Sequence, residues 1–581
     1  MEKRWVVKKS GDTEQVNSLA SALGVEKSIA NLLVQRGVTD ADLAKAFFHP
    51  ELNMLHDPFL MKDMDIAISR IETAIANSEK ILVYGDYDVD GTTAVALVLS
   101  FFKKTYPALD YYIPDRYSEG YGISIKSIDF ASENNFKLII ALDCGIKAIE
   151  QVAYAKSKGI DFIICDHHRP SAELPAAIAI LDPKQNDCTY PFNELSGCGV
   201  GFKLIQAYSQ KHNIPFENIM QYLDLVAISI ASDIVEITGE NRILAYYGLK
   251  QINTAPRPGI EAILFHCGMK RKTVFNTDDF IFNKELNIND LVFMIGPRLN
   301  ASGRIEHGKS TVELLLCEDS ECAAVMSDSI NLNNTERRTF DTSITQQALE
   351  MIWADKKMMK AKTTVVFNPE WHKGVVGIVA SRLTDSFYRP TIVLTQSNGL
   401  ISGSARSVKD FDIYDAIDAC RDLLEHFGGH KYAAGLSMKA ENLELFKQRF
   451  EEVVSSTINE DSLVPEIAID TVLNLSDITP KFFTVLKQFA PFGPGNMSPI
   501  FLTKGVVDKG FARLVGENHL KLCVTHPAST NNYFAGIAFQ QAKHLPFVNR
   551  RKPFDICYHV EENEWNGSVY LQLNVKDIKI T

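Results

Sequence analysis

A chain of 581 residues, of which 46% are hydrophobic and 23% charged, has room for three or four globular domains and is too balanced in composition for a disordered, collagen-like or coiled-coil protein. Its 60 Lys and Arg against 72 Asp and Glu give a net charge of −12, so a polyanionic ligand must be attracted by a local groove or by bound cations. The chain has no run of 18 uncharged apolar residues, no apolar signal segment and no CxxC pair among its ten cysteines, which predicts a cytoplasmic protein with reduced thiols and no membrane span.

The first half of the chain predicts helices, then an α/β domain, then more helices. Residues 1–75 show helical periodicity and are expected to form a helical lead-in. Residues 76–250 alternate short Ile-, Leu- and Val-rich runs with amphipathic stretches, which is typical of buried parallel strands in a doubly wound domain. Residues 251–360 are mostly helical and end in a polar segment that is expected to connect two lobes.

The second half predicts a smaller α/β domain at residues 361–457 and a β-rich tail at residues 460–581. The even strand spacing of the tail is typical of a small barrel, which can hold a nucleic-acid strand on exposed aromatic and cationic side chains. The candidates for such contacts are Lys504, Lys509, Phe511, Arg513, Lys521 and Phe539, although aromatic side chains at this spacing more often belong to a core.

Acidic and imidazole side chains follow three predicted strands of the first α/β domain. They are Asp86, Asp88, Asp90, Asp143, Asp166, His167 and His168. The carboxyl ends of parallel strands meet at one edge of a sheet, so carboxylates placed there must take up protons or hold cations. An oxygen-rich site with one or two imidazoles suits Mg²⁺ or Mn²⁺, and the DxDxD spacing favours two ions. The alternative is a set of helix caps with two buried structural histidines.

Two polar segments of the smaller α/β domain are candidates for binding phosphate. Gly428, Gly429 and His430 are expected to form a tight Gly-rich turn whose backbone N–H groups could hold a phosphate, although such turns often only begin a helix. Ser404 and Arg406 add a hydroxyl and a guanidinium, which suit bidentate phosphate contact, and the alternative is a pair of surface groups.

A third polar segment, with Arg298, Asn300 and Arg304, is expected to be a loop after an apolar strand, either gripping phosphates or forming a solvated turn. Residues 303–310 match the P-loop pattern GxxxxGK[ST], but no buried strand precedes the first glycine, so an ATP site is not predicted. His372 is, from the sequence alone, as well explained by a capping or core histidine as by a binding role.

The motifs GDYDVDG, LDCG, DHH and GGHKYAAG, in this order, resemble those of the DHH phosphoesterase superfamily. RYSEGYGIS, GPRLNASGR, WHKGVVG, GSARS and APFGPGN narrow the resemblance to the RecJ family of single-strand-specific exonucleases, over nearly the whole chain. The resemblance implies a parallel-sheet DHH domain joined by a long helix to a smaller DHHA1 domain, with a C-terminal OB-fold barrel. It also implies hydrolysis of single-stranded DNA from the 5′ end in repair and recombination. Single-strand-binding protein and a recombination helicase are the implied partners, and a monomer is expected.

The resemblance also implies roles for individual residues. Two Mn²⁺ or Mg²⁺ ions would be held by Asp88, Asp90, Asp143, His167 and Asp233. Asp86 would be a further ligand or a group behind the ligands, a share left open because Tyr84 stands where some members have His. His168 would stabilise the transition state with Asp86 and Asp166 beside it, Asp166 orienting its neighbours. The implied substrate-binding residues are Arg116, Tyr121, Arg298, Asn300, Arg304, His372, Ser404, Arg406, Gly428, Gly429 and His430.

Two other functions compete with this hypothesis. Another DHH enzyme could hydrolyse short oligoribonucleotides or cyclic dinucleotides, although such enzymes generally lack the barrel tail and the helical lead-in. An inactive replication scaffold is disfavoured because scaffolds can lose carboxylates without penalty, whereas all of them stand in this sequence.

Overall fold

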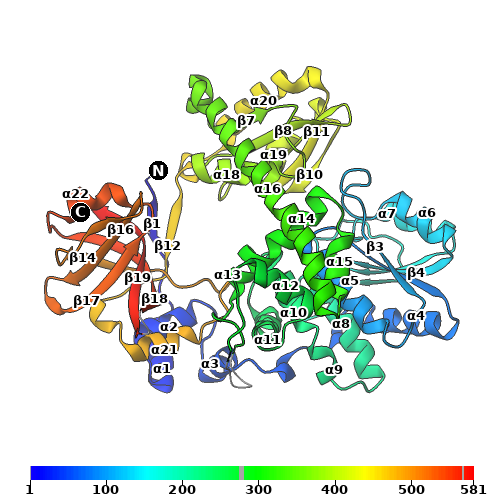
Figure 1. The fold of residues 1–581 in the computed structure, drawn as a ribbon, viewed down its shortest axis with the longest axis horizontal. Helices are drawn as coiled ribbons and strands as arrows, with labels where there is room; N and C mark the ends of the chain where they lie inside the picture. Colours follow the sequence, from blue (N-terminus) through cyan, green and yellow to red (C-terminus); the bar gives the residue numbers. More distant parts are fainter. Residues whose placement is uncertain (1, 274–279, 566–567, 581) are drawn as a thin grey trace.

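The computed structural model describes residues 2–273, 280–565 and 568–580. Figure 1 shows a parallel-sheet domain on the right, a small α/β domain at the top and a barrel on the left, with helices between them. Within the described ranges, no helix has both the length and the apolar character that crossing a membrane requires.

The parallel-sheet domain is built on five strands in the order β3-β2-β4-β5-β6, with every neighbouring pair parallel. The strands are β2 (Lys80–Gly85), β3 (Leu109–Tyr112), β4 (Phe136–Leu142), β5 (Asp161–Cys165) and β6 (Ala179–Leu181). Successive side chains of a strand point to opposite faces, so Ile81 and Val83 join one core while Leu82 and Tyr84 join the other. The strand order reverses between β2 and β4, which is where doubly wound sheets bind ligands.

Helices cover both faces of this sheet. One face carries α4 (Met64–Ala76), α5 (Val89–Phe102), α8 (Gly197–Lys211), α9 (Glu217–Met220), α10 (Leu223–Ser232) and α11 (Gly239–Thr254). The other carries α6 (Ile125–Glu133) and α7 (Ile149–Ser157). Helix α5 is buried along nearly its whole length because it packs against β2 as well as α8 and α10, which explains its almost uniformly apolar sequence.

The helical region predicted after this domain ends in a long connecting helix. Its elements are α12 (Pro258–His266), α13 (Ile288–Asp290), the π-helical turn η3 (Leu291–Ile295), α14 (Gly296–Ile305), α15 (Lys309–Leu316), α16 (Ser320–Ala354) and α17 (Lys356–Lys360). The polar loop predicted at residues 296–304 is wrong: the segment is helix α14, which continues directly from η3 and has Pro297 in its first turn, where proline is well tolerated. The 35-residue α16 joins the parallel-sheet domain to the small domain, as predicted.

The small domain has a five-stranded sheet in the order β10-β11-β9-β8-β7. Its elements are β7 (Thr364–Phe367), α18 (Val376–Phe387), β8 (Thr391–Ser397), β9 (Leu400–Arg406), α19 (Ile413–Asp418), β10 (His426–His430), β11 (Ala433–Met438) and α20 (Leu443–Thr457). The tight turn predicted at residues 428–430 is wrong, because these residues lie in the edge strand β10, paired with β11. A Cβ atom on Gly429 would collide with the backbone of Ala433, so this strand pair needs glycine.

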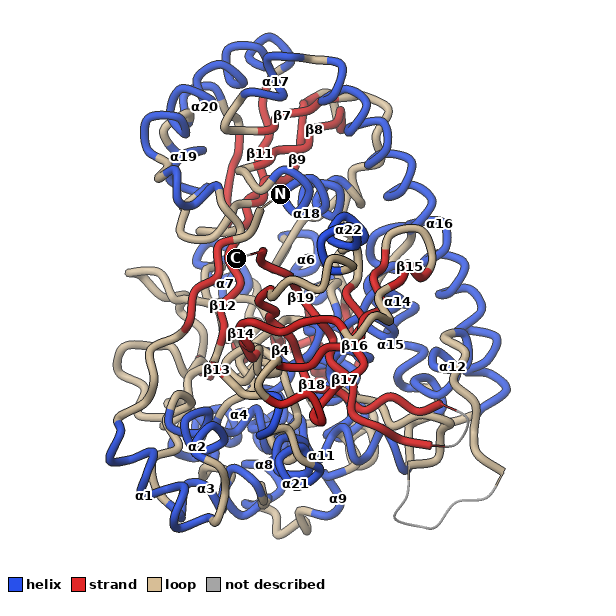
Figure 2. Tube along the Cα trace, turned by 90° about the vertical axis from the view of Figure 1, so that its left-hand side faces the viewer, coloured by secondary structure: helices blue, strands red, loops and turns tan. Residues whose placement is uncertain are grey.

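The C-terminal strands close a five-stranded barrel in the order β14-β18-β19-β17-β16, with β16 pairing back to β14. The elements are β12 (Glu466–Ile469), β13 (Thr471–Val472), α21 (Pro480–Lys487), β14 (Phe501–Asp508), β15 (Arg513–Val515), β16 (His519–His526), β17 (Ser529–Ala538), α22 (Leu545–Val548), β18 (Phe554–Trp565) and β19 (Ser568–Ile580). Figure 2 views the molecule from the barrel side. Among the predicted DNA contacts, Phe511 and Phe539 are exposed on its surface.

The predicted helical lead-in does not form one unit. The helices α1 (Thr13–Leu23), α2 (Lys27–Val34) and α3 (Ala41–Phe48) share a core with the barrel and α21, while α4 belongs to the parallel-sheet domain. Strand β1 (Arg4–Val7) pairs in parallel with β12. The start and the end of the chain are therefore folded together, as Figures 1 and 2 both show.

One arginine links the unit formed by α1–α3, α21 and the barrel to the parallel-sheet domain. The Arg242 side chain on α11 is buried and donates to the Phe47 carbonyl at 2.9 Å, the Phe489 carbonyl at 2.8 Å and the Ala490 carbonyl at 2.9 Å. Its guanidinium also lies 3.9 Å from the centre of the Phe47 ring. A single side chain therefore satisfies carbonyls from α3 and from the segment after α21.

Replacing Arg242 with Met is expected to destabilise the protein by about 3 kcal/mol, because several buried carbonyls lose their donor at once. The measurement is the midpoint of thermal unfolding followed by circular dichroism. Arg421→Met is the matched control, since Arg421 is 67% exposed and pairs with Asp418 at the surface. Equal midpoints for the two variants would contradict the role of Arg242.

Candidate metal centre

The turn between β2 and α5, together with the first turn of α5, carries the first three aspartates. The Asp88 side chain caps α5 by accepting a hydrogen bond from the Gly91 N–H at 3.0 Å. A Cβ atom on Gly91 would collide with the Asp86 backbone, so the sharp turn requires glycine there. The turn thereby points Asp86, Asp88 and Asp90 toward the carboxyl edge of the sheet.

Two helices hold Asp90 in one orientation. Its Oδ1 accepts from the Cys198 N–H at 2.7 Å and the Ser229 hydroxyl at 2.6 Å, and its Oδ2 accepts from the Gly197 N–H at 2.7 Å. Gly197 and Cys198 form the start of α8, where unpaired N–H groups and the helix dipole favour a negative charge. A Cβ atom on Gly197 would lie 2.5 Å from the Asp143 Cβ, so glycine lets α8 approach the cluster.

His167 lies at the centre of the remaining carboxylates. Its Nε2 is 3.1 Å from Asp143 Oδ1 and 3.6 Å from both Asp90 Oδ2 and Asp233 Oδ2. Asp143 follows β4, His167 follows β5, and Asp233 ends α10, so three elements converge on one point. The ligand atoms of Asp90, His167 and Asp233 all lie within 4.8 Å of one another, which is close enough to share an ion.

Burial and mutual repulsion disfavour the charged forms of the carboxylates in this cluster. Burial and then the neighbouring carboxylates raise the pKa of Asp143 and Asp86 well above the usual range, and raise the pKa of Asp233 to about 8. Among the described residues, Asp86, Asp143 Oδ1 and both ring nitrogens of His167 are buried without a hydrogen-bond partner. Buried polar atoms without partners are rare, so this donor set fits divalent cations.

His168 lies beside that cluster and forms a pair with Asp166. The Asp166 carboxylate accepts from His168 Nδ1 at 2.7 Å, from the Ile146 N–H at 2.9 Å and from the His167 N–H at 2.8 Å. Burial opposes both charges, but the hydrogen bond and the attraction outweigh it, raising the pKa of His168 to about 9 and holding the pKa of Asp166 below its usual range. The pairing with Asp166 therefore favours the protonated, cationic form of His168.

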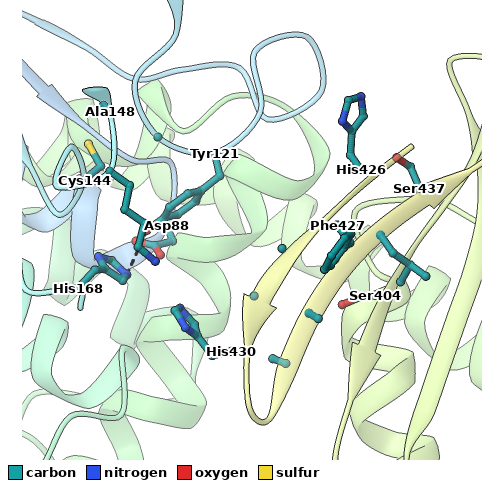
Figure 3. A pocket seen from close by; sticks show the side chains of 18 of the residues that line it. Asp88, Tyr121, Cys144, Ala148, His168, Ser404, His426, Phe427, His430 and Ser437 are labelled. Carbon is teal, nitrogen blue, oxygen red and sulfur yellow. Dashed lines mark hydrogen bonds between the residues drawn. The ribbon is translucent and has the colours of Figure 1, made fainter. Parts of the chain in front are cut away.

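A cleft of about 1150 Å³ separates the parallel-sheet domain from the small domain. Asp88, Tyr121, His168 and Asp233 line one wall, as Figure 3 shows for the first three. Figure 3 also shows His430 projecting from β10 toward His168, with Ser404 farther along the opposite wall. The Tyr121 hydroxyl lies 3.2 Å from His168 Nε2. Asp166 therefore holds the His168 ring by Nδ1 and leaves its Nε2 facing the cleft.

Arginines concentrate positive charge beside this cleft. Arg406 Nη1 donates to the Ser404 hydroxyl at 2.7 Å, and Arg304 Nη1 donates to the Gly374 carbonyl at 3.0 Å. Arg116 lies 4.9 Å from the centre of the Tyr87 ring. Burial, and then the guanidiniums of Arg116 and other arginines, lower the pKa of Arg304 to about 9. Guanidiniums held this close to one another favour an anionic ligand.

Five predicted substrate-binding residues are not among the described residues that line the cleft: Arg116, Arg298, Asn300, Arg304 and His372. The Arg298 guanidinium donates hydrogen bonds to the Asn331 side chain at 3.2 Å and to the Met294 carbonyl at 2.9 Å. The His372 ring stacks on Phe340 at 5.0 Å between centroids. Both contacts join α16 to its neighbours, so the structure gives these two side chains a packing role.

Sequence reasoning missed several residues of the site. Asp182 follows β6, is fully buried with Oδ2 unpartnered among described residues, and burial raises its pKa to about 7. The same rule of a carboxylate after a strand could have found it. Gly197 and Ser229, which hold Asp90, had no such indication, because their role depends on helix packing.

Comparisons with known proteins agree with this architecture. Residues 80–230 match the N-terminal domain of the DHH family, residues 360–456 match the DHHA1 domain, and residues 469–577 match the RecJ OB domain. The chain is 37% identical to the single-stranded-DNA-specific exonuclease RecJ of Bacillus subtilis, covering 100% of this chain and 71% of that protein. It is 33% identical to RecJ of Escherichia coli, covering 89% of this chain and 90% of that protein.

A solved structure has the same overall fold. The crystal structure of RecJ in complex with Mn²⁺ from Thermus thermophilus superposes with a TM-score of 0.83 at 26% identity, covering 100% of this chain and 80% of that one. The fold class predicted from the sequence is thereby confirmed. All three domains and the full-length identity lead to one conclusion: the chain belongs to the RecJ family of single-stranded-DNA-specific exonucleases.

Proposed function

We propose that this chain hydrolyses single-stranded DNA from its 5′ end and releases 5′-mononucleotides, with two Mn²⁺ or Mg²⁺ ions as cofactors, in DNA repair and recombination. The observation that carries the proposal is the cluster of buried carboxylates around His167, whose unpartnered polar atoms fit divalent cations. Family membership supports the choice of substrate, and RecJ of Thermus thermophilus has been solved with Mn²⁺ and with Mg²⁺.

The residues that would hold the ions are Asp88, Asp90, Asp143, His167 and Asp233, with Asp86 as a further ligand or a group behind the ligands. When bound, divalent cations supply a nucleophilic water at neutral pH and offset charge on the reacting phosphate. Asp90 is fixed by α8 and α10, so its position does not have to be reorganised during the reaction.

His168 stabilises the reacting phosphate from the side of the cleft. Asp166 accepts a hydrogen bond from His168 Nδ1–H, which leaves the Nε2–H group free to donate to a phosphate oxygen. The hydrogen bond and the charge of Asp166 favour the protonated imidazole. Asp166 is thus a positioning residue for His168.

The opposite wall binds the 5′ end of the strand. Arg406 and Ser404 offer a guanidinium and a hydroxyl, and Arg116 and Arg304 add positive charge. Strand β10 is the edge of its sheet, so part of its backbone remains available to a ligand, and the glycines leave that backbone uncovered. An edge strand thereby takes the binding role that the sequence suggested for a turn.

The direct test uses one 20-nucleotide strand labelled at the 5′ or the 3′ end, with Mn²⁺ or Mg²⁺ present. We expect the 5′ label to appear at once as a mononucleotide and the 3′ label to appear in a ladder of shortening products. A ladder from the 5′-labelled strand, or equal cleavage of a paired duplex, would contradict the proposal.

Replacing Arg406 with Ala is expected to raise KM about 10- to 100-fold on a 5′-phosphorylated strand, because a charge-assisted contact to the phosphate is lost. The same substitution should change KM far less on a strand with a 5′-hydroxyl. Steady-state kinetics on both strands measure the difference, and Arg421→Ala at the exposed surface is the control. An equal change in KM on the two strands would show that Arg406 does not bind the 5′ phosphate.

We also propose that the protein acts as a cytoplasmic monomer that meets single-strand-binding protein and a recombination helicase. This proposal rests on the family resemblance. Sedimentation velocity, with and without purified single-strand-binding protein, tests the monomer and the first partner in one experiment.

A further inference from the structure

The turn between α15 and α16 carries two cysteines. Cys317 directly follows the last residue of α15, and Cys322 lies in the first turn of α16. Cys322 is the one exposed cysteine in the described part of the chain, and Cys317 is half-buried beside it. Both thiols can therefore be reached from solvent, unlike the buried thiols of Cys144 and Cys165 in the parallel-sheet domain.

Asp319 holds the two cysteines together. Its carboxylate accepts a hydrogen bond from the Cys322 N–H at 2.7 Å and so caps α16, while its carbonyl accepts from the Cys317 thiol at 3.2 Å. The Cys322 thiol is in turn in hydrogen-bond contact with the Cys317 thiol. One residue thus fixes the backbone of the second cysteine and the side chain of the first, and the two sulfur atoms meet.

The contact between the two thiols is what a disulfide bond requires of its cysteines. A bond can form only between side chains that point toward each other, because cysteines that point apart need the backbone to move. Here a rotation of the side chains is enough, and α15 and α16, which already contact each other, can stay in place. The alternative is a pair of thiols that only end one helix and begin the next, which explains their positions but not their contact.

The surroundings of the pair set its reactivity. The hydrogen bond to Cys317 is the main cause that raises the pKa of the Cys322 thiol, and the Asp319 carboxylate adds to it. The thiolate is the form that attacks an oxidant, so the first oxidation step is slow. The step that follows is fast, because the second thiol is already in contact and needs no encounter. The pair should therefore pass from two thiols to one disulfide without accumulating an intermediate.

We infer that Cys317 and Cys322 form a reversible disulfide bond when the protein meets hydrogen peroxide, and return to thiols when a small thiol reductant is present. The inference is independent of the proposed nuclease function. Disulfides of proteins in reducing compartments are usually transient or serve to sense oxidants, and a bond between an exposed and a half-buried thiol is of that kind. The bond would join the end of α15 to the first turn of the connecting helix α16.

The proposed oxidation has two steps. In the first, the thiolate of Cys322 attacks one oxygen of hydrogen peroxide, the O–O bond breaks, and a sulfenic acid forms on Cys322. The hydroxide that leaves takes up the proton that Cys322 released and becomes water. In the second, the Cys317 sulfur attacks the Cys322 sulfur, the S–S bond forms, and the hydroxyl group leaves as water with the Cys317 proton. The two sulfurs lose two electrons in all, and the peroxide oxygens gain them.

The test treats the full-length protein with hydrogen peroxide, blocks the remaining thiols and digests the chain with a protease that cleaves after glutamate. Glu318 and Glu321 both lie between the two cysteines, so cleavage separates Cys317 from Cys322 in the reduced protein and leaves them joined in the oxidised protein. We expect the joined peptides and a loss of two of the ten free thiols. Before blocking, the intact mass should fall by two hydrogen atoms, and dithiothreitol should restore it.

Three variants separate the pair from the other thiols. Cys317→Ser and Cys322→Ser should each abolish the joined peptides. In Cys317→Ser, the sulfenic acid on Cys322 has no thiol to meet, so a dimedone probe should label this variant several-fold more than the unmodified chain. Cys523→Ser on β16 removes a half-buried thiol elsewhere and should form the bond as the unmodified chain does. The thermal unfolding midpoint of the oxidised protein should equal or exceed that of the reduced protein, because the bond joins groups already in contact.

An intact mass that rises by oxygen atoms, without joined peptides, would overturn the inference, as would a bond that links two copies of the chain through Cys322. The same holds if dithiothreitol does not restore the thiols, or if oxidation lowers the unfolding midpoint, since the turn would then have to distort. A loss of two thiols in Cys317→Ser that matches the loss in the unmodified chain would place the oxidation at other cysteines and overturn the inference as well.

Discussion

Replacing Asp143 with Asn is expected to reduce nucleotide release from single-stranded DNA by about 10³-fold, a loss of roughly 4 kcal/mol of transition-state stabilisation. Asp143 Oδ1 lies 3.1 Å from His167 Nε2 and is buried without a hydrogen-bond partner among the described residues. The amide keeps the size of the side chain but removes the charge that a divalent cation needs. Steady-state kinetics with saturating Mn²⁺ measure the loss.

The fold of that variant should remain intact, because the substitution also removes a repulsive charge from the crowded cluster. Asp187→Asn is the matched control: Asp187 is 68% exposed and pairs with Lys62 at the surface. The control should retain full activity. Near-normal turnover by Asp143→Asn would contradict the proposed role of Asp143 as a metal ligand.

Adding Mn²⁺ to the metal-free protein is expected to raise the thermal unfolding midpoint by several degrees. A ligand that binds only the folded state stabilises it by about 2.7 kcal/mol at one hundred times its dissociation constant. The effect should be large here, because cations also relieve the repulsion that raises the pKa of Asp143 and Asp233.

The shift should disappear with EDTA, shrink strongly in Asp143→Asn and persist in Asp187→Asn. Differential scanning fluorimetry over a series of Mn²⁺ and Mg²⁺ concentrations gives the comparison. An identical shift in the Asp143→Asn variant would show that the ions bind elsewhere on this acidic chain.

The sequence predicted the parallel sheet and the carboxylates at its edge because both follow from local patterns. Apolar runs indicate buried strands, and parallel strands bring their carboxyl ends together whatever lies between them. That is why Asp86, Asp88, Asp143 and His167 could be grouped before the structure was known. Asp233 ends a helix, and only the family resemblance pointed to it.

The errors arose where tertiary contacts override local preference. A run of glycines usually indicates a turn, but at β10 it permits two strands to approach closely. The polar segment at residues 296–304 forms a helix because η3 precedes it and α16 packs on it. Arg298 has the chemistry of a phosphate ligand, yet its donors are already used by Asn331 and Met294.

The shared core of α1–α3 and the barrel has a consequence for synthesis of the protein. The first 50 residues leave the ribosome long before β14 begins at Phe501. At about 5–20 residues per second, their apolar faces wait roughly 25 to 90 s for a partner. These helices therefore stay without their partner for that long, and folding of this unit can finish only after β19 has been synthesised.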